Sequence, residues 1–118
     1  MRARLRIRVD FDEGTILSPG KVRLFELIDE CGSLEGAAAT IQMDRDHARH
    51  VITRLEHLFG GPLVVVGSDG RSKLSDLGKM VIVRYHAAER ISAEAAERAL
   101  NELVSLAPGK GAIDANSA

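Results

Sequence analysis

Basic and polar side chains recur along one side of residues 44–58, a segment with the spacing of an amphipathic helix. Ala48, Ile52 and Leu55 share one side, which is expected to pack on a core. The opposite side and its flanks carry Arg45, Asp46, His47, Arg49, His50, Thr53, Arg54 and His57. Such side chains can bond base edges and phosphates, and Arg49 is the best candidate for a bidentate contact with guanine.

Two further places along the chain predict contacts with phosphate. Arg71 and Lys73 follow a glycine-rich stretch, residues 67–70, which is expected to form the tip of a β-hairpin. From there they would reach DNA phosphates or the minor groove. Ser33 is expected to cap a short helix, and the exposed amides at the start of such a helix attract a phosphate.

The charge balance sets a limit on this chemistry. The 118-residue chain has a formal net charge of −1, and residues 1–75 hold 11 Lys and Arg against 11 Asp and Glu. Within the helix of residues 44–58, three carboxylates offset three guanidinium groups: Asp44, Asp46 and Glu56 against Arg45, Arg49 and Arg54. A nucleic-acid partner would therefore be held by a local patch, with modest affinity and a steep dependence on salt.

The N-terminal residues read as a hairpin. Residues 4–11 alternate between basic and apolar side chains, which predicts a strand. Its inward residues would be Leu5, Ile7, Val9 and Phe11, and its outward residues Arg4, Arg6 and Arg8. A turn at residues 12–14 and a short return strand at 15–17 complete the hairpin. The arginines, with Arg2, form either a phosphate-binding strip or the solvated face of an edge strand, and the second interpretation is favoured.

Three helices and a second hairpin follow. Ser18-Pro19 begins the first helix, and Cys31-Gly32 ends it. Ser33 begins a short second helix containing a run of alanines, residues 37–39, and small side chains there allow another helix to approach closely. Asp44 caps the third helix, which ends at Phe59-Gly60-Gly61-Pro62. Residues 63–66 and 71–74 then form the two arms of the second hairpin.

A fourth helix is predicted from Asp76 to about Leu106, roughly 45 Å long, which is more than a domain of this size can cover. Its apolar residues recur every three or four positions, which favours a partner helix from a second copy. The expected interface is Leu77, Val81, Tyr85, Ala88, Ile91, Ala95, Ala99 and Leu103. The predicted organisation is a DNA-binding domain over residues 1–75, a dimerisation helix over 76–106 and a disordered tail over 107–118.

This order of elements predicts a mainly α fold with small β-hairpins, of the α+β class. Helix, short helix, third helix and hairpin make up a winged helix-turn-helix. In that fold the third helix enters the major groove, and the hairpin contacts the backbone.

The chain also resembles a known family. Residues 32–39 (Gly-Ser-Leu-Glu-Gly-Ala-Ala-Ala), 58–64 (Leu-Phe-Gly-Gly-Pro-Leu-Val) and 74–78 (Leu-Ser-Asp-Leu-Gly) are similar to the DNA-binding domain of LysR-type regulators. The N-terminal hairpin and Ser18-Pro19-Gly20-Lys21 narrow the resemblance to the N-terminal domain of ModE-type, molybdate-responsive regulators. It implies a dimeric winged helix-turn-helix in which the long last helix forms the dimer. A molybdate-binding domain is not expected in this chain, so molybdate is not an expected ligand.

Other chemistry finds no support in the sequence. The single cysteine, Cys31, excludes an internal disulfide and fits a reducing cytoplasm. His50 and His57 share a helical face with Asp46, but no further ligand is supplied nearby, so a metal site is not expected. We therefore expect no cofactor, no catalysis and no membrane segment.

Two functions of different class remain open. The first is a homodimeric, cytoplasmic regulator of transcription that binds double-stranded DNA. The second is a winged-helix module that binds a protein and not DNA. The balanced charge of the third helix supports this alternative. We expect the first, on the basis of fold analogy.

Overall fold

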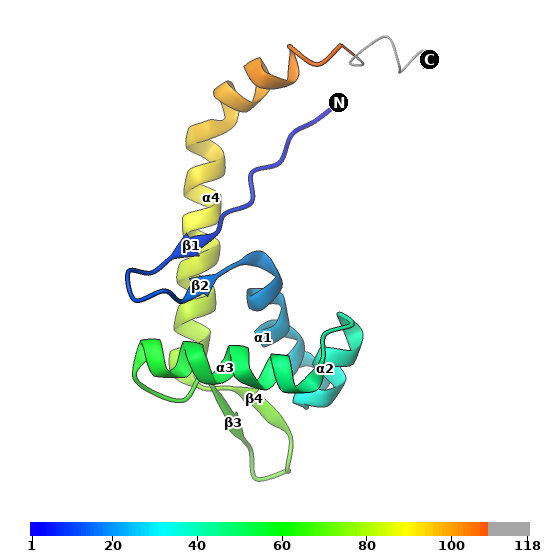
Figure 1. Cartoon of the computed structure of the whole chain (residues 1–118), viewed down its shortest axis with the longest axis vertical. Helices are drawn as coiled ribbons and strands as arrows, with labels where there is room; N and C mark the ends of the chain where they lie inside the picture. The colour runs from blue at the N-terminus through cyan, green and yellow to red at the C-terminus, as the bar shows by residue number, and fades with distance from the viewer. Residues whose placement is uncertain (109–118) are drawn as a thin grey trace. The chain divides into compact units, whose positions relative to one another are not determined.

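The computed structural model of this chain describes residues 1–108, which form helices and two small antiparallel sheets (Figure 1). The elements are β1 (Val9–Asp10), β2 (Ile16–Leu17), α1 (Pro19–Cys31), α2 (Leu34–Thr40), α3 (Arg45–Phe59), β3 (Val64–Val66), β4 (Ser72–Leu74) and α4 (Asp76–Val104). The predicted α+β class, with a winged helix-turn-helix and a long last helix, is confirmed. The predicted tail falls mostly on residues 109–118, outside the described residues.

The described residues separate into two compact units. One is Ile7–Tyr85, and the other combines Met1–Arg6 with the residues from His86 onward. The helix α4 begins in the first unit and continues into the second. Each unit is therefore described by itself.

Short-range signals set the ends of the helices. The Ser33 hydroxyl accepts a hydrogen bond from the Gly36 N–H, and the Asp44 carboxylate accepts from the N–H groups of Asp46 and His47. These bonds satisfy amides that have no partner inside a helix. Gly32 ends α1 in the left-handed conformation, with φ of 79°. The predicted N-cap Ser18 stands before α1 but makes no side-chain capping bond, so Pro19 alone marks this start.

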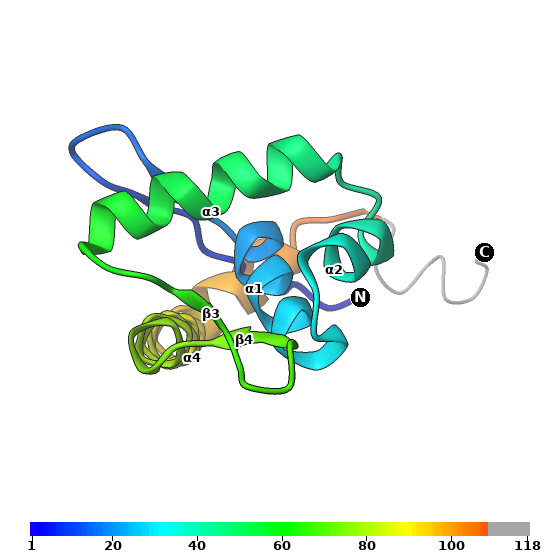
Figure 2. The same ribbon diagram turned by 90° about the horizontal axis from the view of Figure 1, so that it is seen from below.

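The core of the unit Ile7–Tyr85 is built around α1. Leu24 and Ile28 are fully buried, and Leu55 of α3 packs in the same apolar cluster. Figure 2 shows α1 at the centre of the helices, with α2, α3, β3 and β4 around it. Ala37 and Ala38 of α2 are also buried, and their small side chains let the backbone of α2 lie close to α1.

The hairpin of residues 63–74, which we call the wing, is held by hydrogen bonds and by the close approach of Gly78 of α4 to the Leu63 carbonyl. Val64 pairs with Leu74 in the antiparallel register of β3 and β4. The Leu74 N–H donates to the Asp29 carboxylate of α1 at 2.9 Å, and the Ser75 N–H donates to the Leu63 carbonyl at 2.9 Å. The first bond fixes the base of the wing to α1, and the second joins the two ends of the wing just before α4 begins.

The N-terminal strand is shorter than predicted. Only Val9 and Asp10 pair with β2, whereas residues 4–8 carry no strand. The return arm is two residues long, so earlier residues meet no partner for a ladder. Buried and exposed side chains still alternate as predicted. The apolar residues of this stretch are partly buried, and Arg4, Arg6 and Arg8 are exposed. The prediction of facing was right, and the prediction of a strand over residues 4–8 was wrong.

Candidate nucleic-acid interface

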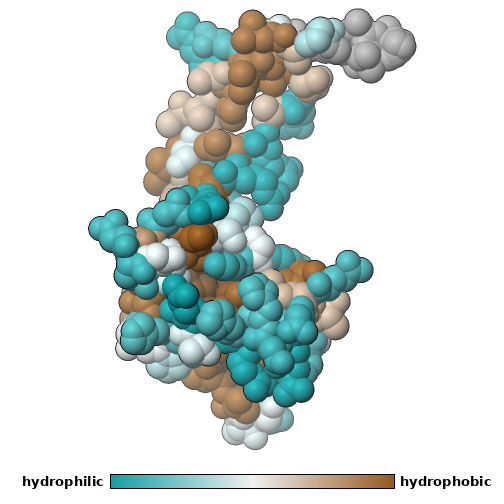
Figure 3. Space-filling model, in the orientation of Figure 1, coloured by the Kyte–Doolittle hydropathy of each residue, from teal (hydrophilic) through white to brown (hydrophobic). Residues whose placement is uncertain are grey.

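The outward side of α3 presents most of the basic side chains named from the sequence. Ala48, Val51 and Leu55 are buried beneath the helix. The residues Arg45, Asp46, His47, Arg49, His50, Thr53, Arg54 and His57 are all exposed. Figure 3 shows the same face as a largely hydrophilic surface. The predicted division of this helix into a packed side and an open side is thus observed, although Val51 is buried there and Ile52, predicted on the packed side, is only partly buried.

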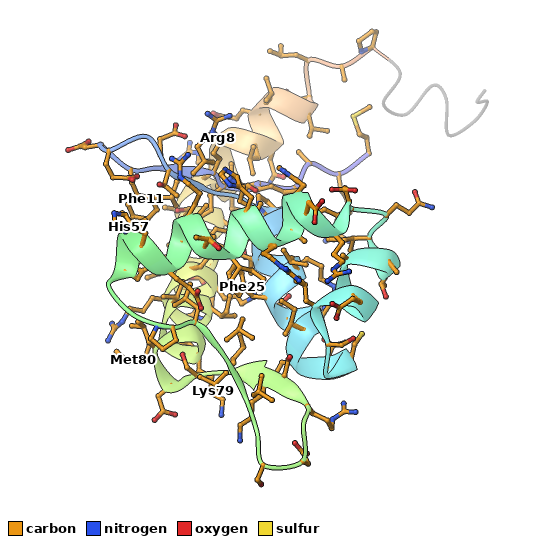
Figure 4. All side chains as sticks on the ribbon, turned by 60° about the horizontal axis from the view of Figure 1, so that its bottom comes forward. Arg8, Phe11, Phe25, His57, Lys79 and Met80 are labelled. Atoms are coloured by element: carbon orange, nitrogen blue, oxygen red, sulfur yellow. The ribbon has the colours of Figure 1, made fainter. Side chains whose placement is uncertain are left out.

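Helical spacing sorts the open side into two flanks. His47, His50 and Arg54 recur at intervals of three and four, so they lie on one flank. That flank is next to the N-terminal hairpin, because an Arg54 Nη2 donates to the Thr15 Oγ1 at 3.3 Å. The other flank holds Glu56, which contacts the wing. In Figure 4 the hairpin and the wing lie on opposite sides of α3.

Arg49 is the most available of the cations on α3. It is exposed, and among residues 1–108 it makes no ion pair. Its carbonyl accepts a bond from the Thr53 hydroxyl at 3.0 Å, which engages Thr53 with the helix and not with a ligand. An unpaired guanidinium on an open helix face can approach a base edge without first breaking a bond to the protein.

Arg45 is engaged on the protein surface. Its Nε lies 3.4 Å from a Glu35 carboxylate oxygen of α2, and both side chains are more than half exposed. Pairs of this kind contribute little to stability, so the guanidinium can exchange Glu35 for a phosphate at small cost.

Arg71 lies against the end of α1. Its Nη2 is 3.4 Å from the Glu30 carbonyl, and its guanidinium covers the left-handed Gly32, where an added Cβ would fall 2.4 Å from the Arg71 Cζ. A cation here is stabilised by the carbonyls at the C-terminus of the helix. The Ser72 N–H also donates to the Gly32 carbonyl at 2.8 Å. Arg71 and Lys73 are both exposed, and Lys73 makes no ion pair among residues 1–108.

Several carboxylates near α3 are engaged by backbone groups. Asp44 caps α3, and Asp69 accepts from the Arg71 N–H at 3.0 Å in the tip of the wing. Glu56 accepts from the N–H groups of Leu63 and Val64, at 2.9 and 3.3 Å. From the sequence, Glu56 was predicted only to offset the charge of an arginine, and its contact with the wing was not predicted. Asp46 is left as the exposed carboxylate in the middle of the open side.

Replacing Glu56 with alanine is expected to lower the free energy of unfolding by about 2 kcal/mol, because two part-buried amides lose a charged acceptor. Urea denaturation of the variant measures this loss. Glu94→Ala, on an exposed position of α4, is the matched control and should change stability by less than about 0.5 kcal/mol. Equal stability of the two variants would contradict the role given to Glu56.

A second set of residues, on α4, was predicted to form a dimer interface. Leu77 and Val81 are partly buried, and Tyr85 is 4% exposed and donates to the Ile7 carbonyl at 2.7 Å. Tyr85 is therefore occupied inside its own unit. Ala88, Ile91, Ala95, Ala99 and Leu103 are exposed in the other unit, and Figure 3 shows hydrophobic side chains along this part of α4. Met80 and Val83, which the predicted stripe does not include, are exposed as well, and so is Leu106, with which the stripe was predicted to end.

No group of three or more His, Cys, Asp or Glu side chains within residues 1–108 is arranged to hold a metal ion. None of the helices described there is both long and apolar enough to cross a membrane.

The chain is also similar to a known protein. The chain is 34% identical over 88 residues to the protein called Molybdenum transport protein ModE from Azotobacter vinelandii. The match covers 71% of this chain and 33% of the relative, so the chain spans about a third of that protein's length. No model of a known protein family matches the chain. The resemblance predicted from the motifs is confirmed by this match.

Proposed function

Starting from this similarity to part of ModE, we propose that the chain is a DNA-binding regulator of transcription. The observation that carries the proposal is the open side of α3, which carries the exposed Arg49, a residue with no ion pair among residues 1–108. The helix itself lies between the two hairpins (Figure 4). The similarity to ModE supports the regulator class. The geometry of α3 supports the mode of binding.

In this proposal α3 enters the major groove. Arg49 donates two parallel hydrogen bonds to the O6 and N7 atoms of a guanine, which only this base offers in that arrangement. His50 lies beside it on the open side and contacts a neighbouring base or phosphate. Lys73, on the wing, contacts the phosphate backbone, which fixes the register of α3 without reading sequence.

The proposed active form is a homodimer joined through α4. Apolar side chains of α4 such as Ile91 and Leu103 are 60% and 61% exposed, and a second copy of the same helix would cover them. Two copies of α3 would then read two half-sites about 34 Å apart on one face of the duplex. The selected DNA sequence is therefore expected to have two-fold symmetry.

The charge of the site shapes the affinity. Asp46 stands on the open side of α3 and repels phosphate, while Arg49 and Lys73 attract it. Each neutralised phosphate contributes about −0.9 to the slope of log affinity against log salt concentration. We expect modest affinity that falls steeply as salt rises, and the same affinity with or without added molybdate.

Replacing Arg49 with alanine is expected to weaken binding to the preferred site at least about 10-fold and to relax the preference at one base pair of each half-site. Selection of bound sequences from random duplex DNA, followed by titration at several salt concentrations, measures both effects. Arg90→Ala, an exposed arginine of α4, is the matched control and should bind as the unaltered chain does. If Arg49→Ala keeps its affinity and its preference, α3 is not the reading helix.

The alternative, a module that binds protein and not DNA, rests on Asp46 and on the neutral charge of α3. It predicts no binding to duplex DNA even at low salt. The selection experiment separates the two functions at its first step.

A further inference from the structure

A pocket of about 210 Å³ lies between the N-terminal hairpin, α1 and α3. It is lined by Gly14 and Thr15 of the hairpin, by Lys21 of α1, and by His47, His50 and Arg54 of α3. No Asp or Glu is among the residues that line it. Since liquid water occupies about 30 Å³ per molecule, the pocket has room for a phosphate group with ordered water.

Part-buried hydrogen bonds and one aromatic contact link the walls of this pocket. Thr15 is a polar residue only 3% exposed, and its hydroxyl donates to the Glu13 carboxylate at 2.7 Å. The same oxygen accepts from the Arg54 Nη2, which ties the hairpin to α3. The rings of Phe11 and Phe59 meet edge to face, with centroids 5.8 Å apart, and join the same two elements. These contacts link the hairpin wall of the pocket to the α3 wall in the chain without a ligand.

The charge in the pocket is unbalanced. The Lys21 Nζ donates to the Ile16 carbonyl at 2.9 Å, which leaves two of its three N–H groups for another acceptor. Partial burial lowers the pKa of Lys21, and the positive charges of Arg54 and Arg8 lower it further. Two hydrogen bonds from Thr15 lower the pKa of Glu13, whose carboxylate they keep occupied. The Glu13 carboxylate also interacts with the Arg54 charge. Lys21, however, has no carboxylate partner among the described residues, so an incoming anion would stabilise its charge.

The position of the pocket identifies the anion. A helix in the major groove has a phosphate backbone on each side of it, and the wing occupies one flank of α3. The pocket lies on the other flank, next to His50, which also belongs to the open side. We propose that the pocket binds one phosphate group of the DNA backbone, so that the N-terminal hairpin acts as a second wing. This inference rests on the proposed function and adds to it an element that the wing and α3 do not provide.

The test is the salt dependence of DNA binding by Lys21→Met, which keeps the length of the side chain and removes its charge. A dimer carries two such pockets, so the slope of log affinity against log salt should become shallower by about 2, or by about 1 for a monomer. Affinity should fall about 10-fold at 0.15 M salt with the preferred base sequence unchanged, since a phosphate contact reads no base. Lys21→Arg should restore the slope. Lys79→Met, on an exposed lysine of α4, should leave the slope unaltered.

Thermal unfolding of each variant shows that it is folded before its binding is compared. If Lys21→Met binds with the full slope, the pocket takes no phosphate and the inference is wrong, while the proposed function stands. If the unaltered chain binds no duplex DNA, the proposed function fails and the assignment to DNA fails with it. Titration with inorganic phosphate would then show whether the pocket serves a free phosphate compound, by saturable binding that Lys21→Met weakens.

Discussion

Replacing Gly78 with alanine adds one methyl group and is expected to lower the free energy of unfolding by about 3 kcal/mol. Gly78 is buried in α4, and a Cβ built there falls 2.3 Å from the Leu63 carbonyl oxygen and 3.3 Å from the Leu74 Cδ2. The first of these atoms is backbone at the base of the wing and cannot rotate away. Either α4 or the wing must move, and both are anchored by the core.

The sign of this stability change distinguishes the steric clash from the helix propensity of alanine, because the two effects have opposite signs. Within a helix, alanine is normally more stable than glycine by about 1 kcal/mol. Gly20→Ala in α1 is the matched control, because nothing lies within 4 Å of its added Cβ, and it should leave stability unchanged or raise it. Urea denaturation of both variants gives the comparison. If Gly78→Ala unfolds at the same urea concentration as the unaltered chain, the close approach of α4 to the wing is wrong.

Replacing Ile91 with aspartate is expected to separate the proposed dimer and to weaken DNA binding by about 10²-fold or more. Ile91 is 60% exposed on α4, with Ala88 and Ala95 nearby on the helix. In the dimer it would be buried against a second copy, and an unpaired carboxylate there would cost several kcal/mol. Monomers lose the gain from two linked half-site contacts, which reaches 10²–10⁴ in affinity.

Analytical ultracentrifugation and DNA titration together measure this result. Arg90→Asp also introduces a carboxylate but falls on another side of α4, so it should remain dimeric and bind DNA. An Ile91→Asp chain that stays dimeric would place the interface elsewhere. An unaltered chain that is monomeric at high concentration would remove the homodimer from the proposal.

Features that depend on a few neighbouring residues could be predicted from the sequence. Ser33 and Asp44 cap helices because their side chains reach amides two or three residues ahead. Gly32 and Gly60 end helices because glycine adopts positive φ without strain. The boundaries of α1 and α3 followed closely from these local effects.

Features that depend on distant contacts could not be predicted. Glu56 bonds to wing amides seven and eight residues away, and Arg71 lies over a helix end 41 residues earlier in the chain. Neither residue type nor spacing distinguishes such a side chain from a solvated one. The same holds for Thr15, whose burial between the hairpin and α3 makes the pocket beside Lys21 possible.

The apolar stripe of α4 shows the limit of periodicity. The pattern identifies which residues share a face, but not whether the chain itself or a second copy covers them. Tyr85 fits the stripe and yet is covered within its own unit, whereas Ile91 and Leu103 are left exposed. Only the folded structure separates these two cases.

The most direct test of the central claim is an amide NMR titration of the labelled chain with a short duplex of the selected sequence at low salt. We predict the largest changes in amide chemical shift in α3 from Arg49 to His57, in the wing around Lys73, and in the N-terminal hairpin at Gly14 and Thr15. Changes confined to α4, or an unchanged spectrum, would contradict this prediction and would make a protein partner the better explanation of this fold.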